Sequence, residues 1–346
     1  MSTVPRISII IVSWNALEHL KNYLPSVAET EYEDFEIILA DNASTDGSKA
    51  WVEANYPNIR IATFDNNYGY CGGNNRAVPH ATGDILIFLN NDVRVEPNWL
   101  DAIARCFKNE KIAAAQPKML SDERREYFEY AGAAGGYLDR FGYSFCRGRI
   151  FDTVEEDVGQ YDNPADILWA SGAALAIRKE IFEKLGGFDE DFEFHMEEID
   201  ICWRIWNNGY KVRFCPKSVI YHLGGGSLPM GSPRKVYYNY RNNLRMIWKN
   251  CSADTIAWRF TGRYVLDIVA AFRTLLRGEW KEFQAIVRAH YDFWNAFPST
   301  QEKRADLQNR RKIDEDPKAM LPINLIVEYF VKKKTTFREV FKRFAF

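Results

Sequence analysis

The sequence predicts an α/β fold, in which a mostly parallel central sheet is flanked by helices and followed by a helical C-terminal extension. Apolar, β-branched runs alternate with helical patterns over the first hundred residues, and this alternation is typical of βαβ units with right-handed crossovers. The run "ILIFL" at 85–89 is apolar at every position, as expected of a central strand that is covered on both faces. After residue 227 the pattern is helical and basic to residue 346.

The individual elements follow in order from these patterns. Strands are expected at 6–14, 35–41, 59–64 and 84–92, and helices between them at 16–28, 44–56 and 74–81. The glycine-rich stretch 67–75 ("NYGYCGGNN") is expected to form a turn that enters the third helix. Mixed glycines, aromatics and charges between 120 and 165 predict loops or an irregular extension of the sheet. Beyond them we expect a strand and a helix over 165–182, a helix over 194–209 and a strand over 211–222.

The charge distribution predicts two parts, 1–234 and 235–346. The chain has 346 residues, 47% of them hydrophobic, which is enough for one large domain with an appendage. Residues 1–234 carry 23 Lys and Arg against 35 Asp and Glu, a charge of −12, and residues 235–346 carry 22 against 12, a charge of +10. A basic extension predicts an anionic partner, either a membrane surface or nucleic acid. Because no zinc-finger or RNA-binding motif accompanies it, we expect no nucleic acid.

The end of the chain carries the pattern of a basic amphipathic helix. Its apolar stripe and flanking basic residues are Phe337, Val340, Phe341 and Phe344, with Arg338, Lys342 and Arg343. Such a helix suits anionic lipid headgroups, and the alternative is a helix that packs on its own domain.

Three further features predict a cytoplasmic protein, which the extension would place at the inner face of the cell membrane. No apolar run approaches the roughly 20 residues that span a bilayer. The opening "MSTVPRISIIIVSW" has the character of a first strand and not of a signal peptide. Six scattered cysteines without a C-x-x-C pair predict reduced thiols, and neither a zinc site nor a disulfide framework.

Polar residues follow several predicted strands at the points where the strands end. Asp41 follows the second strand, Asn90, Asn91 and Asp92 follow the fourth, and His222 ends the last. Asp and Asn commonly serve only as turn and cap residues, and a single His is usually a satisfied polar residue. In α/β sheets, however, ligands bind beyond the carboxyl ends of the strands. One carboxylate with nearby amides suits a Mg²⁺ or Mn²⁺ ion that is shared with a diphosphate.

The helix expected at 194–209 contains a candidate general base. One face of this helix is polar and carries Glu197, Asp200, Arg204 and Asn207. Glu198 lies off that face, in line with Ile201 and Ile205, so we expect its side chain to point towards the protein body. Partial burial raises the pKa of a carboxyl towards values useful for a base. The simpler explanation of Glu198 is a first-turn Glu that complements the helix dipole. On the polar face, the i,i+4 spacing of Asp200 and Arg204 predicts an ion pair.

Six motifs, in this order, resemble the inverting family 2 glycosyltransferases, and most nearly their bacterial rhamnosyltransferase-like branch, which acts on surface polysaccharides. They are "SIIIVSWNALEHL", "ADNASTDGS", "NNYGYCGGNNRAV", "GDILIFLNNDV", "WASGAALAIRKEIFEKLGGFDEDFEFHMEEIDICWR" and "VIYHLGGGS", and the resemblance spans about residues 6–250. It implies a GT-A fold, a nucleotide-diphosphate sugar as donor, a divalent cation, and a glycan or lipid-linked glycan as acceptor.

The resemblance also implies a role for each matching residue. The nucleotide pocket falls on Val12, Ser13, Trp14, Asp41, Asn67, Gly73, Asn74 and Asn91. "NND" falls on the D-x-D motif, so that Asp92 holds the metal and Asn90 replaces the first acid. His222 falls on a His that completes the metal site in some members. "EEID" falls on the E-D-x-D pattern, which puts Glu198 on the base of a single, inverting displacement.

Other chemistries find less support in the sequence. "GYCGGNN" is not G-x-G-x-x-G and follows the third strand, so a Rossmann dinucleotide site is not expected. A P-loop and a G-x-S-x-G motif are both absent. Two alternatives stay open. A sugar nucleotidyltransferase usually has a glycine-rich basic loop near its N-terminus, which "SWNALEHLKN" lacks, and a non-catalytic carbohydrate-binding protein would not need Asp92 and Glu198 together.

Overall fold

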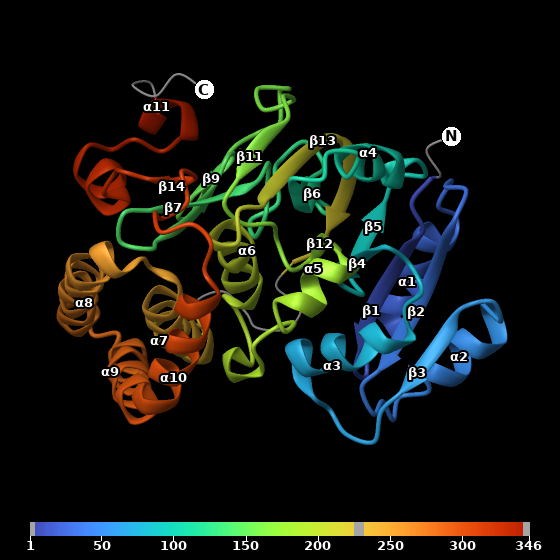
Figure 1. The fold of residues 1–346 in the computed structure, drawn as a ribbon, viewed down its shortest axis with the longest axis horizontal. Coiled ribbons are helices and arrows are strands. Elements are labelled where there is room, and N and C mark those ends of the chain that lie inside the picture. The colour runs from blue at the N-terminus through green and yellow to red at the C-terminus, as the bar shows by residue number, and fades with distance from the viewer. Residues whose placement is uncertain (1–3, 225–231, 342–346) are drawn as a thin grey trace.

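The computed structural model describes residues 4–224 and 232–341, which form a large sheet flanked by helices, a smaller second sheet and a C-terminal helical region (Figure 1). The large sheet has nine strands in the order β11-β13-β6-β12-β4-β1-β2-β3, with β5 paired to β13. They are β1 (Ile7–Ser13), β2 (Phe35–Asp41), β3 (Arg60–Thr63), β4 (Ile85–Leu89), β5 (Val93–Val95), β6 (Ile112–Ser121), β11 (Ala165–Ile167), β12 (Ala174–Arg178) and β13 (Lys211–His222). The α/β class is confirmed.

The N-terminal half of this sheet is parallel, as expected. β4, β1, β2 and β3 lie side by side in parallel pairs, and α1 (Leu17–Ala28) and α2 (Ser48–Asn55) connect them. The register pairs Ser13 with Asp41 and Asp41 with Thr63. The residues that end these strands are therefore neighbours at one edge of the sheet.

Beyond β4 the sheet becomes mixed, because β12 runs antiparallel to both β4 and β6. β6 and β13 are parallel, and β11 and β5 lie antiparallel against β13. Only a short turn separates β4 from β5, and the pairing of β5 places Val93 opposite His222. The residues of that turn are thus brought next to the end of β13.

Alternate residues of the central strands fill two hydrophobic cores, one on each face of the large sheet. In β4, Ile85, Ile87 and Leu89 belong to one core, and Leu86 and Phe88 belong to the other. All five are buried. Because helices cover both faces, no position of this strand is left for a polar residue.

The glycine-rich stretch that we expected to be a turn lies largely inside a helix, α3 (Gly69–Ala77), so this part of the prediction is wrong. Close packing explains the glycine at position 73: a Cβ there would lie 2.9 Å from Val12 Cγ1. A residue without a side chain lets the helix approach the end of β1 this closely. The glycine-rich stretch therefore forms a helix that packs directly on β1.

The segment between 120 and 165 contributes most of the second sheet, whose order is β10-β9-β8-β7-β14. Its strands are β7 (Gly136–Asp139), β8 (Ser144–Cys146), β9 (Arg149–Ile150), β10 (Thr153–Val154) and β14 (Met320–Leu321). β14 comes from the C-terminal extension and pairs with β7 in parallel. The extension is therefore not helical throughout, and the boundary at residue 234 stays a prediction.

The remaining helices cover the large sheet or form the helical region at the left of Figure 1. They are α4 (Trp99–Cys106), α5 (Lys179–Lys184), α6 (Glu197–Asn207), α7 (Pro233–Asn250), α8 (Ala253–Leu276), α9 (Trp280–Asn295), α10 (Phe297–Arg310), the π-helix Val327–Val331 and α11 (Phe337–Phe341). Within the two described ranges, no helix is both long enough and apolar enough to cross a membrane.

The apolar stripe that we expected to dock on a membrane packs instead on the protein. Phe337, Val340 and Phe341 of α11 are buried, and Phe145 of the second sheet stacks on Phe341 with ring centroids 5.7 Å apart. Phe344, the fourth residue of the stripe, lies outside the described residues. The alternative of a helix packed on its own domain therefore describes α11.

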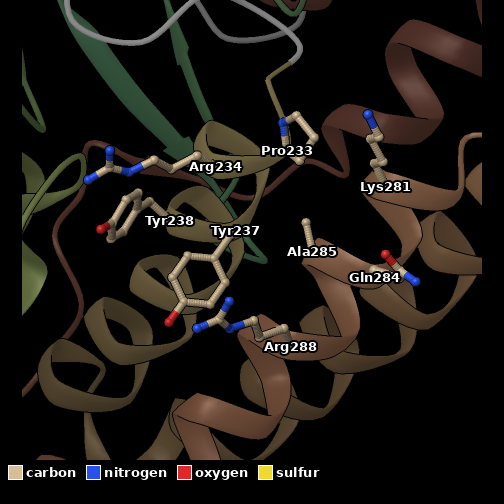
Figure 2. Close-up of a pocket in the computed structure, with 8 residues that line it drawn as sticks. All are labelled: Pro233, Arg234, Tyr237, Tyr238, Lys281, Gln284, Ala285 and Arg288. Atoms are coloured by element: carbon tan, nitrogen blue, oxygen red, sulfur yellow. The ribbon is translucent and has the colours of Figure 1, made fainter.

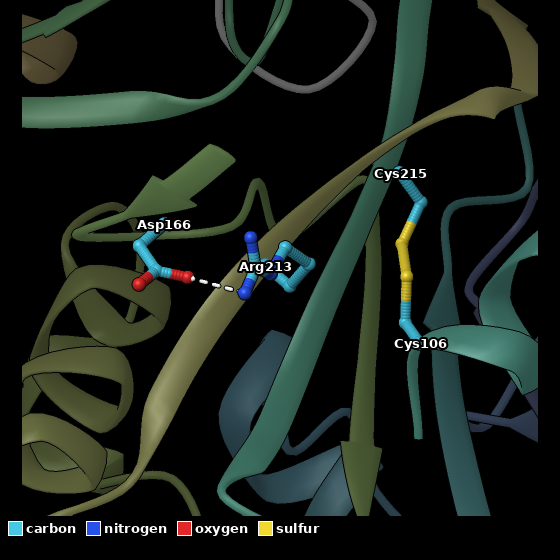
Figure 3. The surroundings of a disulfide bond; sticks show 4 residues. All are labelled: Cys106, Asp166, Arg213 and Cys215. Carbon is cyan, nitrogen blue, oxygen red and sulfur yellow. Dashed lines mark ion pairs between the residues drawn. A yellow bond between two sulfur atoms is a disulfide. The ribbon is translucent and has the colours of Figure 1, made fainter. Parts of the chain in front are cut away.

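One pair of cysteines forms a disulfide, Cys106–Cys215, which corrects the expectation of reduced thiols at these positions (Figure 3). The two residues are 109 positions apart and meet because α4 packs against β13. Sequence spacing cannot reveal such a long-range contact. The other four cysteines are free and buried.

An ion pair connects the edge strand β11 to β13. Arg213 of β13 lies 2.9 Å from Asp166 of β11 (Figure 3).

Candidate active site

Several of the residues predicted to bind nucleotide meet at the ends of β1 and β2. Ser13 and Asp41 are paired in the register and are both buried, and Val12 packs against Gly73 of α3. Asp41 Oδ1 accepts a hydrogen bond from the backbone N of Ser44 at 3.2 Å. The Ser13 hydroxyl is buried without a hydrogen-bond partner among the described residues. Because an unsatisfied buried polar group costs free energy, this edge is suited to a polar ligand.

Asn42 holds this edge together, although the sequence analysis did not assign it a role. Its side-chain nitrogen donates to Asn67 Oδ1 at 3.0 Å and to the carbonyl of Gly69 at 3.1 Å, and its own oxygen accepts from the backbone N of Tyr68 at 3.1 Å. The side chain is fully buried. Asn42 thereby places Asn67 beside the N-terminal end of α3. Its position next to Asp41 was the only signal for it in the sequence.

The other predicted nucleotide residues lie around this cluster in different environments. Trp14 follows β1 and is exposed, and Asn91 is half-buried in the turn after β4. Asn74 is buried in α3, where its side-chain nitrogen donates to the carbonyl of Tyr70 at 3.0 Å. The exposed indole of Trp14, next to Ser13, offers an aromatic face at the rim of the cluster.

The two predicted metal ligands are in direct contact. His222 Nε2 lies 3.2 Å from Asp92 Oδ1, and both side chains are buried. The side-chain nitrogen of Asn90 lies 3.5 Å from the same His222 nitrogen, and the backbone N of Leu223 donates to the carbonyl of Asp92 at 3.1 Å. The pairing of β5 with β13 produces this contact between residues 130 positions apart.

Glu129 stands behind His222 and was missed by the sequence analysis. Its Oε1 lies 3.3 Å from His222 Nδ1, so it can orient the ring and leave Nε2 directed at Asp92. Burial alone would lower the pKa of His222, but the charges of Glu129 and Asp92 outweigh burial and raise it to about 10. Burial alone would raise the pKa of Asp92, but the hydrogen bond with His222 outweighs it and lowers this pKa. Glu129 lies in the irregular segment 120–165, where no motif marks it.

This donor set fits a divalent cation that a ligand helps to hold. A carboxylate oxygen and an imidazole nitrogen converge at the end of the sheet, and a carboxylate behind the imidazole is the usual outer partner of a metal-binding His. Among the described residues, no three His, Cys, Asp or Glu gather into a group that could hold a metal ion by themselves. Oxygens from a bound diphosphate would therefore have to complete the coordination, as is common for Mg²⁺.

Glu198, the candidate base, is a carboxylate in an apolar environment. Its Oε2 is buried and has no hydrogen-bond partner among the described residues, although the residue as a whole is half-buried. Burial raises the pKa of Glu198 to about 7, although backbone hydrogen bonds at the start of α6 counteract it. A carboxyl with a pKa near neutrality is well matched to accepting a proton from a hydroxyl.

A short chain of contacts connects Glu198 with the turn that carries Asp92. A Cβ on Gly172 would lie 3.7 Å from Glu198 Cβ and 3.2 Å from the hydroxyl of Tyr70, which donates to the carbonyl of Gly172 at 2.6 Å. The next residue, Ala173, accepts a hydrogen bond from the backbone N of Asn90 at 3.0 Å. The candidate base therefore lies beside the segment before β12, and the turn that carries Asp92 is hydrogen-bonded to the same segment.

The polar face of α6 is also buried, because α7 packs against it. Arg204 donates to Asp200 at 2.9 Å, which confirms the predicted ion pair, and Asn250 of α7 donates to the other oxygen of Asp200 at 2.7 Å. Burial and the neighbouring Glu198 carboxyl raise the pKa of Glu197 well above its usual value. Both faces of α6 are thus covered. Glu197, which we expected on the solvent-facing polar side, is buried, and Glu198 is only half-buried, so burial does not single out Glu198 as expected.

The loop before α6 is held in strained backbone conformations. Glu193, His195 and Met196 have positive φ angles of 60°, 65° and 76°, a conformation that costs free energy for residues other than glycine and is found at functional sites. Asn242 of α7 stabilises the loop, since its side-chain nitrogen donates to the carbonyls of residues 192, 194 and 195 at 2.7, 2.7 and 3.0 Å. The start of α6, and with it Glu198, is fixed from outside the helix.

Comparison with known proteins gives a consistent result. The family model "Glycosyl transferase family 2" matches residues 8–186, which is more than half of the chain. The chain is 30% identical over 215 residues to O-antigen biosynthesis protein RfbC of Myxococcus xanthus, which covers 60% of this chain and 16% of that protein. It is 25% identical over 230 residues to N-acetylglucosaminyl-diphospho-decaprenol L-rhamnosyltransferase of Mycobacterium tuberculosis, covering 62% of this chain and 75% of that protein.

The solved structures support the fold. The structure of GalNAc-T7 with UDP, GalNAc and Mn²⁺ superposes with a TM-score of 0.56 and 20% identity, over 72% of this chain and 48% of that one. The 1–349 fragment of S. aureus TarS in complex with UDP superposes with a TM-score of 0.53 and 16% identity, over 95% and 92% of the two chains. At these identities the likeness concerns the fold, and it confirms the expected GT-A architecture.

Proposed function

The chain belongs to glycosyl transferase family 2, as its motifs indicated, and from this premise we propose that it transfers a sugar from a nucleotide-diphosphate donor to a hydroxyl of a glycan or lipid-linked glycan, with inversion. The relatives named above are a protein of O-antigen biosynthesis and a rhamnosyltransferase, and the comparisons give no support to a sugar nucleotidyltransferase or a binding protein. The chain spans about a sixth of the first relative and three quarters of the second. The identities of the donor and of the acceptor are therefore proposed and not taken from these relatives.

The observation that carries the mechanism is the buried Oε2 of Glu198, which has no hydrogen-bond partner among the described residues and lies beside the segment that binds the turn after β4. Near neutral pH a substantial fraction of Glu198 is ionised, because its pKa is about 7, and its buried Oε2 is free to accept a proton. Glu198 takes the proton of the acceptor hydroxyl as that oxygen bonds to the anomeric carbon. The bond from this carbon to the diphosphate breaks on the opposite face, and the nucleoside diphosphate leaves.

Asp92 and His222 are the residues that would hold a divalent cation, Mg²⁺ or Mn²⁺, and such a cation neutralises charge that develops on a leaving diphosphate. Glu129 keeps the His222 ring in place from behind. The edge formed by Val12, Ser13 and Asp41 would bind the nucleoside, with Trp14 at its rim, and Asn42 fixes the loop that carries Asn67. These assignments rest on the contacts above and on the family motifs.

A second feature supports action at a membrane surface, through α8 and not through α11. Five apolar residues form an exposed stripe along one face of α8, each between 43% and 87% exposed: Val265, Ile268, Val269, Phe272 and Leu276. In Figure 1, α8 lies at the outer edge of the helical region. Arg273 and Arg277 flank the stripe, and exposed Trp258 and Trp280 lie at its two ends. Apolar residues bordered by Trp and Arg match the interface of an anionic bilayer.

Flotation with vesicles tests this surface. The full chain should float with phosphatidylglycerol vesicles and less with phosphatidylcholine, and the double substitution Val269→Ser, Phe272→Ser should keep it in the dense fraction. Val158→Ser, at an exposed apolar position outside the helical region, is the matched control. Equal flotation of the α8 variant and the control would contradict the proposal, and concentration-dependent dimerisation without flotation would assign the stripe to a second copy.

The function itself is tested by release of nucleoside diphosphate from a panel of nucleotide sugars, with Mn²⁺ and with EDTA. Asp92→Asn keeps the size of the side chain and removes its charge, so it should abolish metal-dependent donor binding while circular dichroism shows that the protein is still folded. His222→Ala should do less, because water can replace an imidazole on a hard cation. Full turnover of Asp92→Asn, or turnover that is indifferent to EDTA, would refute the metal site.

A further inference from the structure

A hollow of about 540 Å³ lies between α7 and α9, and none of the predicted nucleotide or metal-binding residues lines it (Figure 2). α7 contributes Arg234, Tyr237 and Tyr238 to its wall, and α9 contributes Lys281 and Arg288. Three of its eight lining residues are cations, and none is acidic. The volume is in the range of small-ligand sites.

The cations of this hollow are largely unpaired. Arg234 and Lys281 are exposed, and neither forms an ion pair with any residue that the structure describes. The guanidinium of Arg234 lies over the ring of Tyr238, 5.7 Å from its centroid. Arg288 has a carboxylate partner at 3.5 Å, Asp292, which also accepts a hydrogen bond from Tyr237 at 2.7 Å. The hollow therefore keeps an excess of positive charge.

A second hollow, of about 310 Å³, is also lined by charged residues, but its cations are paired with carboxylates of the protein. Its cations Lys249 and Lys303 both bind Asp189, and its Arg310 pairs with Asp306 at 2.8 Å. Carboxylates in its own wall neutralise these charges. The hollow between α7 and α9 has no such carboxylates, so its charge is available to a ligand.

The position of the α7–α9 hollow relates it to the acceptor. Tyr238 lines the hollow, and its hydroxyl donates to Glu193 Oε2 at 2.8 Å. Glu193 begins the strained loop that leads to Glu198. The predicted nucleotide residues lie on β1, β2 and α3, and α6 lies between them and α7 in Figure 1. A group in the hollow is thus on the side of the base that is away from the donor.

We propose that this hollow binds the diphosphate that links the acceptor glycan to its carrier lipid. Guanidinium groups bind phosphate oxygens through paired, charge-assisted hydrogen bonds. The two cations without an ion-pair partner among the described residues, Arg234 and Lys281, match the two negative charges of a diphosphate diester. The tyrosine rings give the hollow an apolar wall beside these charges. The inference rests on the proposed function, because it presupposes that Glu198 acts on an acceptor. It adds a binding site outside the strand ends, and the residues of α7 and α9 that would contact the diphosphate.

Titration calorimetry of the full chain with farnesyl diphosphate in EDTA tests the proposal, because EDTA removes the metal that a diphosphate would need at the donor site. The full chain should bind, and Arg234→Gln and Arg288→Gln should each weaken binding about tenfold, as expected for loss of a charged hydrogen-bond donor. Gln284→Glu, which places a negative charge in the wall without changing its size, should weaken binding similarly. Arg310→Gln, in the second hollow, is the matched control, and Asp92→Asn should bind like wild type.

Three results would overturn the proposal. The first is undiminished binding by the Arg234, Arg288 and Gln284 variants in folded form, with thermal midpoints like that of the control. The second is an equal loss in the Arg310→Gln control. The third is equally tight and equally sensitive binding of inorganic pyrophosphate, which would make the hollow a site for free phosphate. Failure of the proposed function would appear separately, as a missing thermal shift with nucleoside diphosphates and Mn²⁺.

Discussion

Opposite kinds of groups lack partners in two regions of the described structure: the candidate site, where the strands end and α6 begins, and the outer face of the helical region. Within the described part of the chain, Ser13 Oγ at the end of β1 and Glu198 Oε2 at the start of α6 are buried without a hydrogen-bond partner. On α8, large apolar side chains such as Phe272 and Leu276 are exposed. Either arrangement costs free energy in the isolated chain. A polar ligand would satisfy the first kind of group, and an apolar surface would satisfy the second.

The same comparison can be made within the C-terminal extension. α8 and α11 both carry an apolar stripe beside basic residues, yet the stripe of α11 is covered by Phe145 and its neighbours and the stripe of α8 is exposed. The periodicity of the two helices is alike, so the packing of other elements makes the difference. The predictions below distinguish side chains that act in the proposed function from side chains that stabilise the fold.

The largest expected effect is on turnover by Glu198→Gln. Loss of a general base lowers the rate by about 10²–10⁴, while donor affinity should stay nearly unchanged because the diphosphate does not contact this residue. Glu197→Gln should be milder, and Asp200→Asn should act mainly through lost stability, because Asp200 binds Arg204 and Asn250. Turnover and donor affinity of the three variants should be measured together. A large loss in Glu197→Gln, with Glu198→Gln near wild type, would reverse the assignment.

The next largest effect is a difference in stability between variants of the buried stripe on α11 and variants of the exposed stripe on α8. Phe341→Ala removes a buried ring and should lower the free energy of unfolding by about 3–5 kcal/mol. Phe272→Ala on α8 should change it by less than about 0.5 kcal/mol, since the ring is exposed. Urea unfolding followed by circular dichroism measures both. Similar losses in the two variants would mean that α8 is covered in solution.

At the metal ligands, Glu129→Gln should weaken Mn²⁺ binding in the presence of a nucleoside diphosphate by about 10- to 100-fold, the usual effect of removing the outer partner of a metal-binding His. Glu126→Gln, three residues earlier and exposed, is the matched control. Calorimetric titration with Mn²⁺ gives both affinities. If Glu129→Gln binds Mn²⁺ like the control, Glu129 does not orient His222 for a metal.

The pKa of Glu198 sets the pH profile. The base must be ionised to act, so turnover should fall about tenfold per pH unit below a pKa of about 7 and level off above it. Turnover measured from pH 5 to 9 shows the profile. In Glu198→Gln the residual rate should lose this dependence. A wild-type profile that is flat between pH 5 and 8 would exclude Glu198 as the base.

The same raised pKa predicts the smallest effect, a gain in stability on substitution. A carboxyl whose pKa is higher in the folded protein than in the unfolded chain stabilises the fold below its unfolded value, near 4.5, and this contribution is lost as the pH rises through about 7. Glu198→Gln should therefore be more stable than wild type at pH 8 by about 1–2 kcal/mol, after allowance for partial exposure. At pH 4 the two should unfold alike. A destabilised variant at pH 8 would show that the carboxylate is satisfied in the folded protein.

The sequence by itself determined the α/β class, the parallel half of the sheet and the order of the motifs, because these depend on local periodicity and on residues at strand ends. Asp41, Asp92, His222 and Glu198 could be proposed as site residues in this way, since each ends, follows or begins a recognisable element. The glycine-rich stretch was placed correctly along the chain but was expected to be a turn, because its close packing on Val12 is a tertiary property.

Only the tertiary structure decided which distant residues meet. Glu129 reaches His222 from an irregular segment, Cys106 reaches Cys215 across 109 residues, and α7 covers the polar face of α6. It also decided that α11 is packed and α8 is exposed, although both sequences are amphipathic. A sequence pattern shows that a face needs covering, but the fold of the whole chain determines what covers it.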